Sequence, residues 1–87
     1  MLEEMLGNII VVDLRSPFVC LGTLERFDDL HLELRNADMH DLRDTQTTRE
    51  NYVAACRTTG VKRNRKRVLV VRSEVVALSL LEDVVDD

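Results

Sequence analysis

The densest run of charge in the chain is basic and spans residues 62–67. Five of its six residues are cations, and no acidic residue lies between positions 51 and 73. Such a run could bind phosphate groups, which gives affinity without reading base sequence. It could equally be a solvated hairpin arm whose basic side chains guard an edge strand against pairing. The candidate phosphate-binding residues are Lys62, Arg63, Arg65, Lys66 and Arg67.

Two polar residues stand beside apolar runs where strands are expected. Arg72 follows four apolar residues, and its planar guanidinium could stack on a base or bind a phosphate. It could instead pair with Asp28 or Asp29 and order the turns. His31 alternates with leucines, and its ring could stack on a base or hydrogen-bond to a base edge. Its structural alternative is a polar residue on the solvent face of a strand.

One short segment with Asp38, His40 and Asp41 could suggest a metal ion. A metal site would need further ligands, and the sequence offers no second cluster of them. The residues also support no Ser-His-Asp order, phosphate-cradling glycine loop or pair of buried carboxylates. We therefore predict a protein that is not an enzyme and that uses no metal and no cofactor.

The elements that position these residues are expected to be mainly β-strands. Residues 9–14 are a β-branched apolar run, typical of a buried strand. Residues 18–27 predict a longer strand, in which Gly22 marks a bend or a close backbone approach. Residues 30–35 alternate, with leucines facing in and His31, Glu33 and Arg35 facing out. Residues 68–71 and 75–81 predict two further apolar strands.

The segment between the third and fourth strands has no such pattern. The strands before and after this segment are expected to extend into a protruding hairpin. Residues 44–64 are expected to form a variable arm that projects from the barrel. Thr48 could cap a short helix that runs through Arg57, because Tyr52, Val53 and Cys56 would share one helical face. Residues 2–6 could form one helical turn before the first strand.

Length and composition limit the classes of protein that remain. The 87 residues suffice for one domain, 1–87. A net charge of −4 and three aromatic residues argue against a generic nucleic-acid binder. Two cysteines without CxxC spacing predict reduced, buried thiols in the cytoplasm. No apolar run approaches the roughly 20 residues that a membrane span requires, so no membrane partner is expected.

The order of elements, together with two blocks of residues, resembles the Sm/LSm (Sm-like) family. Each motif alone is weak, whereas their combination in this order is more specific. The matching residues are Leu6-Gly7, Ile9 to Leu14, Val19, Gly22, Leu24, Phe27-Asp28 and Leu32-Glu33-Leu34 in the first block, and Val68 to Ser73 and Val75 to Leu78 in the second. Residues 36–66 carry no resemblance.

The resemblance implies a short N-terminal helix followed by a strongly bent, five-stranded Sm-like barrel. It also implies subunits joined edge to edge in a ring, with single-stranded RNA bound at the inner rim of the pore. The rim residues would be Asp28, His31, Arg72 and Ser73, although Asp29 could match the family's Asp in place of Asp28. The chain departs from the family pattern in its turns: the segment between Phe27 and Leu32 and the turn after Ser73 are each one residue short. His31 also replaces the usual Asn, and Ser73 replaces the usual Gly.

Two functions therefore remain open. The first is an RNA-binding ring subunit, an RNA chaperone or ribonucleoprotein component, built as a homo-oligomer of five to seven copies. The second is a ring-forming assembly module that has lost its RNA site, which the net acidity and the scarce aromatics favour. A ring is expected in both cases, because the two apolar terminal strands would otherwise leave edges exposed to aggregation.

Overall fold

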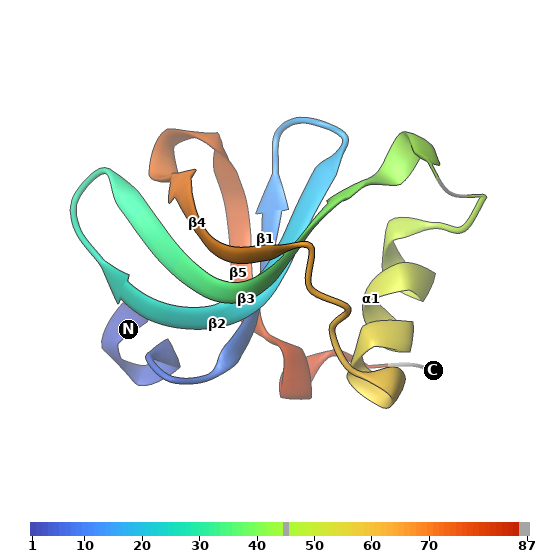
Figure 1. The fold of residues 1–87 in the computed structure, drawn as a ribbon, viewed down its shortest axis with the longest axis horizontal. Coiled ribbons are helices and arrows are strands. Elements are labelled where there is room, and N and C mark those ends of the chain that lie inside the picture. The colour runs from blue at the N-terminus through green and yellow to red at the C-terminus, as the bar shows by residue number, and fades with distance from the viewer. Residues whose placement is uncertain (45, 86–87) are drawn as a thin grey trace.

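Five antiparallel strands form one strongly bent sheet, in the order β4-β3-β2-β1-β5 (Figure 1). The computed structural model describes residues 1–44 and 46–85. A 3-10 turn at Leu2–Met5 precedes the sheet and confirms the expected short N-terminal helix. The elements are β1 Ile9–Leu14, β2 Phe18–Phe27, β3 His31–Asp41, α1 Arg49–Thr59, β4 Arg65–Val71 and β5 Val75–Leu80, with 3-10 turns at Leu42–Asp44, Arg72–Glu74 and Leu81–Asp83.

The bend in β2 and β3 is centred on Gly22. Leu21 pairs with Asp38 and Thr23 pairs with Arg35, so Gly22 alone faces two residues of β3. Such a β-bulge bends the strand and increases its twist. One of the two extra residues, Asn36, has a left-handed φ of 49°. A Cβ on Gly22 would lie 3.0 Å from the Cβ of Ala37, so a side chain at this position would force its neighbours to shift. The bend expected at Gly22 is confirmed.

Both faces of the central strands are buried, each in its own apolar cluster. Residues 10 and 12 of β1 face the inside of the bent sheet, and residue 11 faces the outside, which explains why β1 is a continuous apolar run. The inner cluster consists of Ile10, Val12, Cys20, Leu24, Leu32, Leu34, Ala37 and Val70. The outer cluster consists of Val11, Val19, Leu21, Val53, Cys56 and Leu81.

Helix α1 covers part of the outer face. Thr48 caps it by accepting a hydrogen bond from the Asn51 backbone N–H at 3.1 Å, as its sequence predicts. Val53 and Cys56 bury their side chains against the sheet. Strands β3 and β4 do extend beyond the apolar runs, as expected. The arm expected at residues 44–64 differs, since Arg49–Thr59 is a helix packed on the sheet and not a projection. Val11, Val19 and Leu21 give the apolar side of the helix a surface to cover. Thr45, within the expected arm, lies outside the described residues.

Both cysteines are buried free thiols, as the sequence predicts. Burial raises the pKa of Cys20 to about 12, so this thiol stays protonated and unreactive at neutral pH. Within residues 1–44 and 46–85, no helix combines the length and the apolar character needed to cross a bilayer.

Candidate functional site

Two turns that are far apart in the sequence meet at one end of the sheet. The β2–β3 turn closes with a hydrogen bond from the Asp28 N–H to the His31 carbonyl, at 3.0 Å. The Arg72 N–H donates to the Leu30 carbonyl at 2.8 Å, and its guanidinium Nη1 donates to the Asp28 carbonyl at 2.6 Å. These bonds fix the β4–β5 turn against the β2–β3 turn, and we call the two together the joined turns. Asp28, His31 and Arg72 are thus brought together, and Ser73 follows in the same turn with its side chain exposed.

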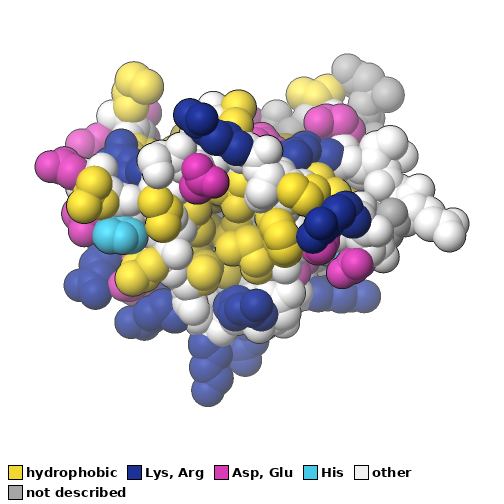
Figure 2. All heavy atoms as spheres, turned by 90° about the horizontal axis from the view of Figure 1, so that it is seen from above, with side chains coloured by type: hydrophobic (Ala, Val, Ile, Leu, Met, Phe, Trp, Pro, Cys, Tyr) yellow, Lys and Arg dark blue, Asp and Glu magenta, His cyan; other side chains and the backbone are white. Residues whose placement is uncertain are grey.

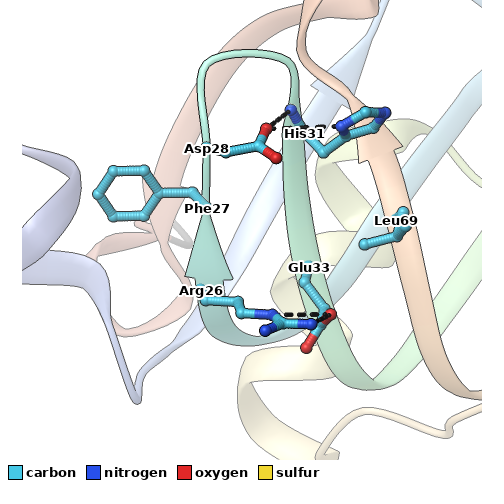
Figure 3. A pocket seen from close by; sticks show the side chains of 6 residues that line it. All are labelled: Arg26, Phe27, Asp28, His31, Glu33 and Leu69. Atoms are coloured by element: carbon cyan, nitrogen blue, oxygen red, sulfur yellow. Dashed lines mark hydrogen bonds and ion pairs between the residues drawn. The ribbon is translucent and has the colours of Figure 1, made fainter.

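Asp28 orders the β2–β3 turn through its carboxylate. Its Oδ1 accepts hydrogen bonds from the backbone N–H groups of Leu30, at 2.8 Å, and His31, at 2.7 Å. The same oxygen lies 3.5 Å from Nδ1 of the His31 ring (Figure 3). The Leu30 and His31 backbone donors hold the pKa of Asp28 below its usual range, so the carboxylate is ionised at neutral pH. Asp28 therefore positions His31, whose side chain is 41% exposed and available to a ligand.

A pocket of about 460 Å³ opens beside this junction. Its walls combine a guanidinium, an imidazole, carboxylates and a leucine, a mixture suited to a planar polar group such as a nucleobase. Figure 3 shows that the Arg26, His31, Glu33 and Leu69 side chains come from strands β2, β3 and β4. Asp28 comes from the β2–β3 turn, and the Phe27 ring points away from the other five side chains. The lining residues are Arg26, Phe27, Asp28, His31, Glu33 and Leu69.

Glu33 is buried, although the sequence predicts that it faces solvent. Its side chain points away from the inner core, as expected, but the residue is only 5% exposed. Arg26 approaches its carboxylate at 3.1 Å and Arg67 at 3.8 Å, and these two guanidinium groups pair with the buried charge. Neither Arg26 nor Glu33 is identified as a site residue by the sequence alone. These residues meet because the strand register pairs Arg26 with Glu33 and Glu33 with Leu69, and the sequence does not reveal that register.

The basic run lies along and just before the edge strand β4, and all five of its cations are exposed. Three of them already have partners within the chain. Arg67 is the ion-pair partner of Glu33, Arg63 donates to Asn36 Oδ1 at 2.6 Å, and Arg65 donates to the Asn64 carbonyl at 3.1 Å. Lys62 lines a second pocket, beneath α1. The last three cations of the run thus lie on an edge strand, as the structural alternative expected, and all five remain accessible to phosphate.

The residues that could suggest a metal ion are engaged elsewhere. Asp38 accepts hydrogen bonds from the Tyr52 hydroxyl and, at 2.9 Å, from Asn64 Nδ2. Asp41 pairs with Arg43 at 2.8 Å. The His40 ring stacks on Tyr52, with their centroids 3.8 Å apart. In the part of the chain that the structure describes, no three potential ligands are grouped so that they could hold a metal.

Comparison with known proteins supports the fold through structure alone. No family model matches the chain, and no curated protein sequence matches it. An Sm protein of Pyrococcus abyssii, solved in complex with a uridine heptamer, superposes with a TM-score of 0.62 at 20% identity, covering 90% of this chain and 89% of that one. An Sm-like protein of Archaeoglobus fulgidus superposes with a TM-score of 0.61 at 22% identity, covering 92% and 88%.

These likenesses cover about nine-tenths of the chain. The expected fold class is confirmed: this chain has the strongly bent, five-stranded fold of the Sm and Sm-like proteins.

Proposed function

We propose that the protein binds single-stranded RNA at the joined turns, as one subunit of a closed ring. It would act by binding and not by catalysis, as an RNA chaperone or ribonucleoprotein component in the cytoplasm. The observation that carries this proposal is a hydrogen bond that holds Arg72 against the β2–β3 turn. The Arg72 Nη1 donates it to the Asp28 carbonyl oxygen at 2.6 Å. This bond places a guanidinium and the exposed His31 ring on one rigid junction, and rigid placement is what base recognition requires.

The Sm protein that was solved with a uridine heptamer supports the same assignment for this chain. The pocket beside the junction adds groups that suit a base. His31 offers a ring surface, and Arg26 offers hydrogen-bond donors. The scarcity of other aromatic residues makes the junction the main stacking position outside α1.

The two edges of the sheet support the ring. β4 and β5 are the outermost strands, and neither contains a proline. Large apolar side chains are exposed on both: Leu69 is 58%, Val71 is 49% and Val76 is 66% exposed. Figure 2 shows hydrophobic side chains gathered at the centre of the face seen from above, with charged side chains around them. Repeated pairing of β4 with β5 of the next copy would close a ring of five to seven subunits.

A second candidate is a ring-forming assembly module that does not bind RNA. The specific observation in its favour is that Arg72 and Asp28 are engaged with each other and with the turns. Their role could then be purely structural. Filter binding separates the two candidates, because a ring without RNA affinity retains neither oligo-U nor oligo-A.

The salt dependence of RNA binding tests how the basic run contributes. We expect the quadruple variant Lys62→Gln, Arg63→Gln, Arg65→Gln, Lys66→Gln to flatten the plot of log K against log salt by about 0.7 for each phosphate that the run no longer neutralises. The preference between oligo-U and oligo-A should stay unchanged, since phosphate contacts carry no sequence information. Arg67 is retained because it pairs with Glu33. An unchanged salt slope would show that the run makes no phosphate contacts.

A further inference from the structure

A second pocket lies at the other end of the molecule, between α1 and the end of β3. It measures about 390 Å³, and its walls include Tyr52, His40, Ala55, Thr59 and Lys62. Figure 1 shows α1 beside the sheet, at the opposite end of the long axis from the β2–β3 turn. None of the residues that line this pocket lines the pocket at the joined turns. The two pockets are therefore separate.

Tyr52 and His40 form a preassembled aromatic stack in the wall of this pocket. Their ring planes are 9° apart and their centroids are 3.8 Å apart. The Tyr52 hydroxyl donates to Asp38, which is also held by Asn64, so the tyrosine ring is fixed to the sheet. A fixed aromatic ring is the type of surface on which an unpaired base stacks.

Two polar groups complete the chemistry of the pocket. His40 Nε2 is buried and has no hydrogen-bond partner among the described residues, and such an atom lowers stability unless a bound group satisfies it. Lys62 is exposed and is the first cation of the basic run, which continues into β4. An aromatic stack beside a lysine matches the two parts of a nucleotide, the base and the phosphate.

We propose that this pocket is a second nucleotide-binding site, in which a base stacks against the Tyr52–His40 pair and Lys62 binds the adjoining phosphate. The ligand is a nucleotide of single-stranded RNA, so the inference rests on the proposed function, although it concerns a different part of the surface. The cations of β4 connect this pocket to the joined turns. One RNA strand can therefore contact both sites of a subunit, and helix α1 gives the chain a contact that the bare five-stranded barrel lacks.

The chain contains its own reporters for the two sites. It has two histidines, one at each site, and Tyr52 is its one tyrosine, with no tryptophan present. Imidazole signals in a proton–carbon NMR spectrum therefore report the sites separately, and tyrosine fluorescence reports the second pocket alone. We expect UMP or AMP, added at millimolar concentration to the full chain, to shift the His40 signal and to quench the tyrosine fluorescence. A short oligo-U should also shift the His31 signal.

Variants test which side chains hold the nucleotide. Lys62→Ala should weaken UMP and AMP binding about three- to tenfold. Arg15→Ala removes the same charge from an exposed position that does not line the pocket, and it should change the affinity less than about twofold. Tyr52→Leu should weaken binding roughly five- to a hundredfold, whereas Tyr52→Phe, which keeps the ring, should restore most of the affinity and controls for loss of folding.

The possible outcomes separate the two proposals. If mononucleotides and oligo-U shift only the His31 signal, the second site is overturned while RNA binding at the joined turns stands. If no nucleotide shifts either histidine, both proposals fail. Equal weakening by Lys62→Ala and Arg15→Ala would indicate diffuse charge attraction and would also overturn the pocket.

Discussion

Replacing Val76 with aspartate is expected to dissociate the ring into smaller species. Val76 lies on the edge strand β5, is 66% exposed and lines a largely apolar groove with Leu2, Met5 and Leu78. In a ring, the neighbouring subunit's β4 would cover this side chain. An unpaired carboxylate at that interface would cost several kcal/mol, because its charge would lose water without gaining a partner.

The matched control for this variant is Val85→Asp. Val85 is 71% exposed and lies outside the five strands, so the same change of charge and size occurs away from either edge. Light scattering on each protein at micromolar concentration should find a ring of five to seven copies for the wild type and for Val85→Asp, but not for Val76→Asp. A stable wild-type monomer under these conditions would show that no ring forms.

The second large effect is expected at the bend. Gly22→Ala should lower the free energy of unfolding by about 1–3 kcal/mol, the typical cost of adding a carbon to a closely packed site. The added Cβ would lie 3.0 Å from the Cβ of Ala37 and 3.1 Å from both its Cα and the Arg35 carbonyl oxygen. Two of these three atoms belong to the backbone, so a side-chain rotation cannot relieve the contact.

Thermal unfolding measures this effect, with a drop of about 4–8 °C in Tm for each kcal/mol in a domain of this size. All variants must be compared at one protein concentration, because assembly would also stabilise the fold. The double variant Gly22→Ala, Ala37→Gly removes the contact between the two Cβ atoms. It should therefore be more stable than the sum of the two single effects predicts. A change within about 0.5 kcal/mol for Gly22→Ala would mean that the bend tolerates a side chain.

The strands could be predicted from sequence because each has a local signal. The run at residues 9–14 indicated a buried strand, and the structure shows that it contributes to both apolar clusters. Gly22 indicated the bend. The extension of β3 and β4 beyond the apolar runs was expected, but its bounds were not, since Asp38 and Asp41 are polar residues that no apolar alternation identifies as strand. Their pairing depends on partners such as Asn64, whose amide bonds to Met39 and Asp38 far away in the sequence.

The candidate site was predicted only in part, because some of its residues carry a local signal in the sequence and others do not. Asp28, His31 and Arg72 were identified from the ends of apolar runs and from the family pattern, and the structure brings them together. The contribution of Arg26 and Glu33 depends on cross-strand register, which composition and spacing do not determine. The position of α1 on the sheet depends likewise on the outer cluster, whose members come from β1, β2, α1 and the last 3-10 turn.

Binding of oligo-U to the wild type and to Arg72→Ala, by filter retention at about 50 mM salt, tests RNA recognition at the joined turns most directly. The matched control is Arg57→Ala, since the Arg57 guanidinium also donates to a backbone carbonyl, that of Val84 at 2.7 Å, but at the other end of the molecule. We expect wild-type binding, an affinity about tenfold or more weaker with Arg72→Ala, and little change with Arg57→Ala. Equal weakening in the two variants, both still folded, or no retention of oligo-U by the wild type, would contradict RNA recognition at this junction.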